Sequence, residues 1–157
     1  MPEFTLKTLY HDHVSSVLNY CNKIWANTYQ THLNPIVILQ KRIVRTLTNS
    51  DFLAHTQPLF HQLNILPINK LRQYDLVLYF HKNRNSLLTH LQSHHTYLTR
   101  NRDRPRPIPH TRSLFEHSFV YQSPKLWNNL LDRHPEAIAL TSILSFKKHL
   151  KNILLSD

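Results

Sequence analysis

The chain has 157 residues, 41% of them hydrophobic, and carries 19 Lys and Arg against 9 Asp and Glu, a net charge of +10 before its 13 histidines are counted. This length fits one domain or two small subdomains, and the single cysteine excludes a disulfide framework and a multi-cysteine zinc module. Glycine is absent, which excludes glycine-rich phosphate loops, dinucleotide fingerprints and nucleophile elbows. The charge favours a partner with dense negative charge, nucleic acid before a membrane surface, although a merely basic helical domain has the same composition.

The expected location is inside the cell, in the cytoplasm or the nucleus. No apolar run approaches the roughly 20 residues of a membrane span. The first residues, MPEFTLKTLYHDH, lack the apolar core of a signal peptide. We therefore expect a protein that is neither secreted nor inserted in a membrane.

Apolar residues recur every three or four positions from Phe4 to Trp25. This spacing predicts one amphipathic helix of about five turns. Cys21 falls on its apolar stripe, so the expected role of this cysteine is core packing rather than catalysis.

Asn34 and Pro35 predict the start of a second helix, because proline is favoured at the first helical position. Its expected buried stripe is Ile36, Leu39, Ile43 and Leu47. The other faces carry three cations: Lys41, Arg42 and Arg45. They form either a solvated face or a surface laid along a phosphate backbone.

The next forty residues predict more helices with short connections. A short helical turn is expected from Ser50, and a second short helix from Thr56 to Leu63. Pro67 precedes a longer helix from Ile68 to about Asn83, which can continue through the following SLLTHLQ. The residues expected on its buried side are Leu71, Tyr74, Leu78 and Phe80.

Residues 93–112 form a basic segment in which arginine alternates with proline. Proline suppresses helix and biases its predecessor to extended geometry. We expect an extended arm whose arginines reach phosphates: Arg100, Arg102, Arg104, Arg106 and Arg112. Tyr97 and Trp127 offer stacking surfaces near its two ends, a combination suited to single strands and irregular RNA. A flexible basic linker that touches nothing specific explains the composition equally well.

The last 45 residues read as a small helical subdomain. Residues 118–122 have the composition of a strand, but the sequence supplies no partner strand for them. A turn at Ser123 and Pro124 and a helical turn over 125–131 follow. A final helix is expected after Thr141 and Ser142, with an apolar face formed by Ile143, Phe146, Leu150, Ile153 and Leu154. The dipole of this helix and solvation account for its lysines: Lys147, Lys148 and Lys151.

No catalytic constellation is present in the sequence. The aspartates are isolated, and Tyr74-Asp75-Leu76 stops one carboxylate short of a polymerase tetrad, so no pair can hold two metal ions. Histidines with ligand-like spacing occur at 11 and 13 and at 90, 94 and 95. No cysteine or carboxylate completes a zinc set beside them, so we assign no metal site.

Six motifs in order resemble the region downstream of the palm in reverse transcriptases of Jockey-like non-LTR retrotransposons. They are LYHDHVSSVLNYCNKIWANTY, LNPIVILQKRIVRTLTNS, HTQPLFHQLNIL, HHTYLTR, SFVYQSPKLWNNL and SFKKHLKNILL. The resemblance spans nearly the whole chain and implies a mainly α fold. It implies a thumb-like helical bundle over 1–92, an extended Arg/Pro-rich linker over 93–112, and a C-terminal extension over 113–157.

The resemblance also assigns roles to particular residues. Gln40, with the three cations after it, matches the basic thumb helix, and Thr99 with Arg100 matches a Thr-Arg box. The tryptophan motif is matched by Tyr121, Pro124, Leu126, Trp127 and Asn128, to which we give a packing role. The implied partners are RNA or an RNA–DNA duplex and the palm and fingers of the same enzyme. Catalytic aspartates are absent here, no cofactor is expected in this chain, and Mg²⁺ belongs with the missing palm.

This sequence departs from the family pattern at two glycines and one proline. Ala26 and Ser123 stand where the family has glycine, and Leu131 stands where it has proline. If Ser123 needs a positive φ, it costs roughly 1 kcal/mol. Such losses fit a truncated or domesticated fragment. A helical module that docks on a protein through the Trp127 region, and a remnant without function, remain alternatives.

Overall fold

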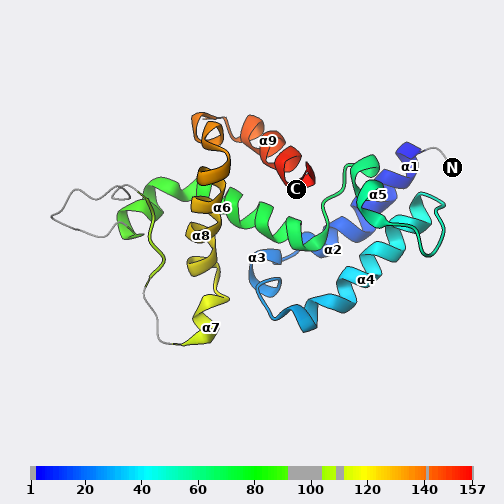
Figure 1. Cartoon of the computed structure of the whole chain (residues 1–157), viewed down its shortest axis with the longest axis horizontal. Helices are drawn as coiled ribbons and strands as arrows, with labels where there is room; N and C mark the ends of the chain where they lie inside the picture. The colour runs from blue at the N-terminus through cyan, green and yellow to red at the C-terminus, as the bar shows by residue number, and fades with distance from the viewer. Residues whose placement is uncertain (1–2, 92–103, 109–111, 141, 157) are drawn as a thin grey trace. The chain divides into compact units, whose positions relative to one another are not determined.

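The computed structural model describes residues 3–91, 104–108, 112–140 and 142–156. Within these residues the fold is mainly helical, as expected, and contains no strand (Figure 1). The chain divides into two compact units, Met1–Arg72 with Leu154–Asp157, and Gln73–Ile153. None of the described helices combines the length and the apolar character that crossing a bilayer requires.

The prediction of one continuous helix up to Trp25 is wrong. The chain forms α1 (Glu3–Leu9), a π-helical turn η1 (Tyr10–Ser15), α2 (Ser16–Asn19) and α3 (Asn22–Trp25). The break lies at Tyr20, which is extended, and at Cys21, which has a left-handed φ of 50°. The indole Nε1 of Trp25 donates to the Tyr20 carbonyl at 2.6 Å and so satisfies a backbone group that the break releases from the helix.

Cys21 is exposed rather than packed in a core, so its predicted role is also wrong. The π-helical turn η1 before Val17 and the break before Ile24 shift the later part of the expected apolar stripe out of register. Tyr10 and Leu18 are buried, whereas Val17 and Ile24 are 69% and 72% exposed. The first unit therefore presents large apolar side chains to solvent.

Helix α4 (Gln30–Leu47) begins before the predicted proline start. Pro35 lies inside it as the sixth residue, where its missing N–H removes one early backbone hydrogen bond. The predicted buried stripe is confirmed in part: Ile43 and Leu47 pack half-buried against the core, whereas Leu39 is 56% exposed and the fully buried positions are Gln40 and Val44.

The core of the first unit joins η1, α4 and α5 (Thr56–Leu63). It is formed by Tyr10, Val44, Phe60, Leu63 and Ile65. The predicted helix from Thr56 to Leu63 is confirmed, and Asn64 ends it with a left-handed φ of 55°. The expected helical turn after Ser50 is replaced by a loop over 51–55.

Helix α6 (Ile68–Leu91) follows Pro67 as predicted and runs without interruption through the SLLTHL segment. Its buried side is formed by Leu76, Val77, Phe80 and His81. Phe80 is thus confirmed as buried, but Leu71, Tyr74 and Leu78 are only half-buried.

The strand composition of residues 118–122 does not produce a strand. Ser118 caps α8 (Phe119–Arg133), and its Oγ accepts from the Tyr121 backbone N–H at 3.3 Å. Pro124 lies within this helix instead of in a turn. A capped helix start satisfies a backbone donor locally, whereas a lone strand would leave its backbone groups unpaired.

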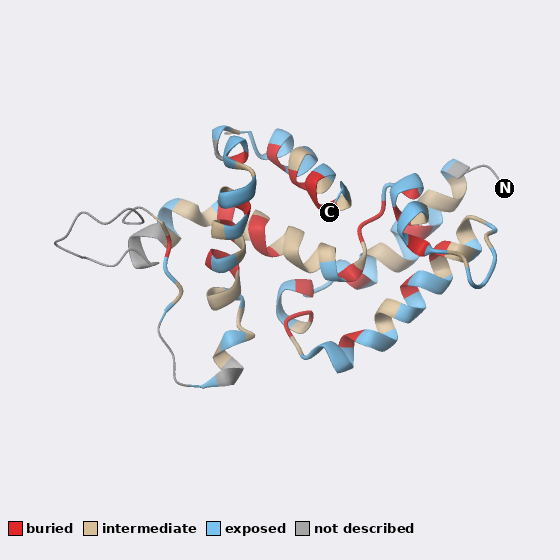
Figure 2. Cartoon of the chain, in the orientation of Figure 1, coloured by how far each residue is buried: buried red, intermediate tan, exposed pale blue. Residues whose placement is uncertain are grey.

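Two short elements and one long helix complete the second half: α7 (Ser113–Glu116), the 3₁₀ turn η2 (Pro135–Ala139) and α9 (Ile143–Ser156). The predicted apolar face of α9 is confirmed for Phe146, Leu150 and the Ile153–Leu154 pair, all buried, while Ile143 is 44% exposed. Figure 2 shows buried positions along one side of α9 and exposed positions along the other.

Ala26 and Ser123, which the resemblance aligns with glycines, sit in ordinary backbone geometry. Ala26 has φ −74°, and Ser123 lies inside α8. Among the described residues, positive φ occurs at Cys21, Asn49 and Asn64. The expected cost of a positive φ at Ser123 therefore does not arise. Both residues are almost fully buried, so these positions require a small side chain.

Candidate nucleic-acid interface

The cations of α4 divide into exposed and structural groups. Lys41 and Arg42 are exposed. Arg45 is half-buried, and its Nε donates to the Ala54 carbonyl at 2.9 Å, which ties the loop over 51–55 to the helix. The structure thus leaves Lys41 and Arg42 open to a partner and engages Arg45 in the fold.

Gln40, beside these cations, is a buried hydrogen-bond centre. Its Nε2 donates to the Tyr10 hydroxyl at 2.8 Å and to the Leu66 carbonyl at 3.0 Å. Its Oε1 accepts from the Ile68 backbone N–H at 2.9 Å. Burial raises the pKa of Tyr10, and the bond from Gln40 partly opposes that shift. Because one amide joins η1, α4 and the start of α6, it fixes the helix that carries Lys41 and Arg42.

The described part of the basic arm, residues 104–108, has no regular secondary structure and contacts α8. Arg104 forms an ion pair with Asp132, with a 2.6 Å distance from Nη1 to Oδ1. One turn earlier on α8, Asn128 donates its Nδ2 hydrogen to the Pro105 carbonyl at 2.8 Å. Pro105 is buried, so this part of the arm is fixed to the helix.

Two of the remaining arm arginines lie among the described residues and two lie outside them. Arg106 and Arg112 are exposed. Arg100 and Arg102, together with Thr99 and Tyr97, lie outside the described residues. Arg104 carries a charge already balanced by Asp132, so Arg106 and Arg112 are the described arm cations best able to reach a phosphate.

The tryptophan motif packs, and its central residue is buried. Trp127 is 5% exposed, and its ring centroid lies 5.2 Å from Phe80 and 6.1 Å from Phe146. Pro124 is fully buried, and Tyr121 and Leu126 are half-buried. Trp127 is therefore part of a core that joins α6, α8 and α9, where it offers no stacking surface to a nucleotide.

His81 completes this aromatic core. Its ring stacks on Phe146 with centroids 4.0 Å apart, and its Nε2 lies 3.2 Å from the Leu140 carbonyl. Burial lowers the pKa of His81, the backbone bond to Leu140 opposes this, and the charge of Arg84 adds to it. The neutral ring with a proton on Nε2 donates to Leu140, so the core carries no charge at neutral pH.

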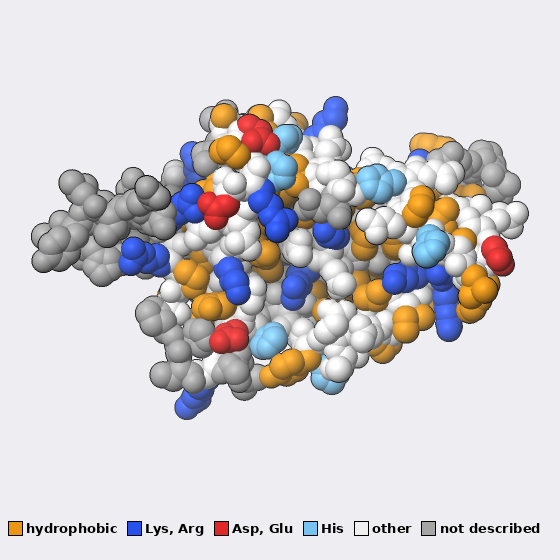
Figure 3. All heavy atoms as spheres, in the orientation of Figure 1, with side chains coloured by type: hydrophobic (Ala, Val, Ile, Leu, Met, Phe, Trp, Pro, Cys, Tyr) orange, Lys and Arg blue, Asp and Glu red, His pale blue; other side chains and the backbone are white. Residues whose placement is uncertain are grey.

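Positive charge is concentrated in the second unit, whose sequence has 12 Lys and Arg against 5 Asp and Glu. The first unit has 7 against 4. Figure 3 shows Lys and Arg side chains widely spaced on the visible face, with few acidic ones among them. This pattern suits an extended polyanion better than a small anion.

Sequence reasoning missed Lys70, which lines one cavity with Lys41. The two lysines come from α6 and α4, and neither periodicity nor spacing along the chain brings them together. Within the described part of the chain, no three His, Cys, Asp or Glu side chains are grouped to hold a metal ion.

The chain matches no protein-family model, no curated protein and no solved structure.

Proposed function

We propose that this chain is the C-terminal, non-catalytic region of a Jockey-like reverse transcriptase, and that it binds template–primer or element RNA through its basic residues. The observation that carries the proposal is the order of its six motifs along nearly the whole chain. The packing is compatible with it. Gln40 and Trp127, which are buried, have structural tasks, whereas Lys41, Arg42, Arg106 and Arg112 remain exposed.

The binding is electrostatic, so its affinity for RNA falls steeply with salt. The test is fluorescence anisotropy with a labelled RNA–DNA duplex at several salt concentrations. The double variant Arg106→Ala/Arg112→Ala reduces the slope of log affinity against log salt by about one to two. Its matched control is Lys147→Ala/Lys148→Ala, which removes the same charge from exposed positions on α9.

Equal slopes for the two double variants would show that net charge alone governs binding and would remove the arm from the interface. The quadruple variant that replaces Arg100, Arg102, Arg104 and Arg106 by Ala extends the test to the whole arm. An unchanged slope in that variant contradicts the arm assignment.

A second candidate function, docking on a protein, is favoured by the exposed apolar residues of the first unit. Phe4, Val17, Tyr20 and Ile24 are each at least 69% exposed. Such side chains commonly mark a protein interface, and the palm of the same enzyme is the partner that the family resemblance implies. Trp127 cannot anchor this contact while it is buried.

This second function predicts self-association that is insensitive to salt, because exposed apolar surfaces pair with each other when their partner is absent. Sedimentation at increasing protein concentration measures it. Val17→Asp/Ile24→Asp should give a monomer, and a wild-type chain that is already monomeric at high concentration contradicts the docking role.

A further inference from the structure

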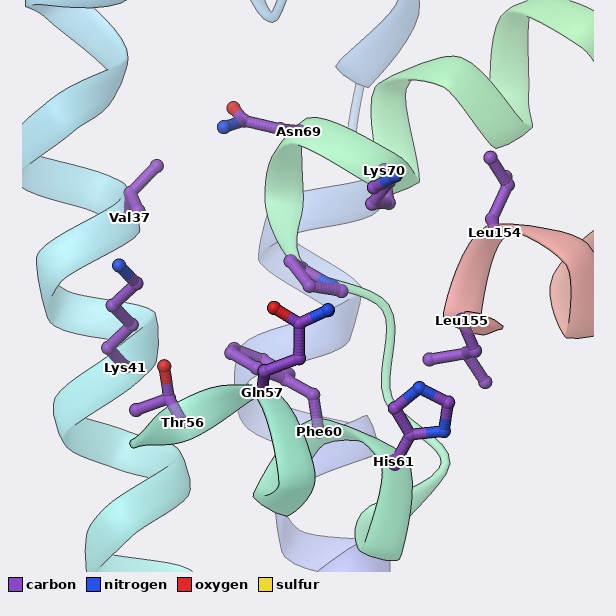
Figure 4. Close-up of a pocket in the computed structure, with 11 residues that line it drawn as sticks. Val37, Lys41, Thr56, Gln57, Phe60, His61, Asn69, Lys70, Leu154 and Leu155 are labelled. Atoms are coloured by element: carbon purple, nitrogen blue, oxygen red, sulfur yellow. The ribbon is translucent and has the colours of Figure 1, made fainter. Parts of the chain in front are cut away.

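The first unit contains an open cavity of about 250 Å³ beside its core. All the lining residues belong to that unit. Figure 4 shows the segments that they come from. Helix α4 supplies Val37 and Lys41, and α5 supplies Thr56, Gln57, Phe60 and His61. The start of α6 supplies Asn69 and Lys70, preceded by Pro67, and the end of α9 supplies Leu154 and Leu155.

The cavity is lined by apolar side chains together with polar and positively charged ones. The apolar part is formed by Val37, Phe60, Pro67, Leu154 and Leu155, of which Phe60 and Leu154 are buried and the others half-buried. Lys41 and Lys70 supply positive charge, and the amides of Gln57 and Asn69 can both donate and accept hydrogen bonds. No Asp or Glu is among these described lining residues, so no lining carboxylate neutralises the two lysines directly.

This combination selects a ligand with a flat or apolar body, hydrogen-bonding edges and an attached negative charge. A purely inorganic anion leaves the half-buried Val37, Pro67 and Leu155 side chains uncovered, and a purely apolar ligand leaves the lysines unused. A nucleotide supplies all three features: a base with a π face, polar base edges that amides recognise, and a phosphate.

We propose that this cavity takes one unstacked nucleotide of a single strand, with its base against the half-buried apolar lining and its phosphate at Lys41 and Lys70. The inference rests on the proposed nucleic-acid binding and adds to it a subsite that depends on bases. An electrostatic surface alone does not distinguish a strand with bases from one without them, whereas this cavity does.

The experiment compares two single strands of about ten nucleotides and equal charge, an oligothymidylate and an abasic DNA of the same length. The wild-type chain binds the oligothymidylate about 10-fold more tightly, a difference of about 1.4 kcal/mol, because only this strand can place a base in the cavity. The variant Gln57→Leu removes an amide placed at the base edge without adding a ring on which a base can stack, and it reduces this preference.

The matched control is Gln62→Leu. Gln57 and Gln62 are exposed glutamines of the same helix α5, but only Gln57 lines the cavity. The control keeps the wild-type preference. Asn69→Leu removes the second amide of the cavity from α6, at another exposed position, and also reduces the preference, which guards against a local defect in α5.

The outcomes separate the two proposals. Equal wild-type affinity for both strands overturns the nucleotide subsite and leaves the electrostatic interface standing. Absence of binding to either strand overturns both. An oligoglutamate peptide of equal charge that displaces the oligothymidylate equally well would show a general anion site and would overturn the nucleotide assignment.

Discussion

The two units of this chain are stabilised by different chemistry. In the first unit, the Gln40 amide makes three hydrogen bonds between elements beside a small apolar cluster around Phe60. In the second, Phe80, Trp127 and Phe146 form an aromatic core with His81 stacked on it. A hydrogen-bond centre depends on direction and fails when one atom is lost, whereas an aromatic core depends on contact area.

The units also differ in what they leave at the surface. The first unit exposes large apolar side chains such as Val17 and Ile24, and the second carries most of the positive charge. We propose accordingly that a protein partner docks on the first unit and an extended polyanion on the second, with one nucleotide in the Lys41–Lys70 cavity of the first.

The largest expected effect is the loss of the aromatic core. Trp127→Ala removes a buried indole and should destabilise the second unit by about 3–5 kcal/mol. Denaturant unfolding followed by circular dichroism measures the loss, and the fluorescence of the remaining Trp25 reports separately on the first unit.

The other tryptophan provides the control. Trp25 is half-buried and contributes one hydrogen bond to Tyr20, so Trp25→Ala should cost about 1–2 kcal/mol. Equal losses of unfolding free energy in the two variants would mean that the aromatic core stabilises the fold no more than a half-buried surface contact does.

A smaller effect is expected from the hydrogen-bond centre. Gln40→Leu keeps the volume but leaves the Tyr10 hydroxyl, the Leu66 carbonyl and the Ile68 N–H buried without this partner, at a cost of about 2–4 kcal/mol. The exposed Gln62→Leu on α5 should stay within about 0.5 kcal/mol of wild type. A neutral Gln40→Leu would show that water satisfies these groups.

A still smaller effect is expected at Ser123, which the proposed resemblance aligns with a glycine. Ser123→Gly should destabilise the chain by about 0.5–1 kcal/mol, because glycine in a helix interior increases the freedom of the unfolded chain. Thermal unfolding measures the difference. Stabilisation by this change would mean instead that residue 123 requires a positive φ.

The smallest expected effect is a pH dependence in the aromatic core. Because burial lowers the pKa of His81 in the folded state, its contribution to stability is complete above the unfolded pKa near 6.5 and is lost as pH falls through the lowered folded value. The slope contributed by this residue is at most about 1.4 kcal/mol per pH unit.

The variant His81→Phe keeps the stacked ring on Phe146 and removes the titration. Urea unfolding between pH 7 and pH 5 should therefore give a shallower decline than wild type. His13→Ala, at an exposed position, should keep the wild-type decline. Parallel curves for wild type and His81→Phe would contradict the role of this histidine.

Much of the fold could be predicted because it follows from local pattern. The start of α5, the path of α6 beyond Asn83 and the apolar face of α9 all come from caps, prolines and spacing along one helix. The break at Cys21 could not be predicted, since periodicity continues through it and the left-handed residue is neither glycine nor asparagine. The cap at Ser118 is hard to recognise from sequence, because the β-branched and aromatic composition of residues 118–122 predicts a strand.

The candidate site was harder to predict for a different reason. The basic residues of α4 and the arm are visible in the sequence, but their partners are not. Arg104 pairs with Asp132, and Arg45 donates to the loop over 51–55. Both contacts join segments that are separate in the sequence, so the pattern of one sequence does not predict them. Trp127 contacts Phe80, and Asn128 donates to the Pro105 carbonyl, so both side chains are engaged within the fold.

The absence of glycine also affects the unfolded state. Left-handed geometry at Cys21, Asn49 and Asn64 costs the folded chain about 1 kcal/mol or less at each asparagine and somewhat more at the cysteine. Against this, every residue of the unfolded chain has less backbone freedom to lose on folding than glycine would have. A polypeptide with nine prolines and no glycine thus begins folding from a comparatively restricted ensemble. This restriction lowers the conformational-entropy cost of folding that burial of the two small cores must offset.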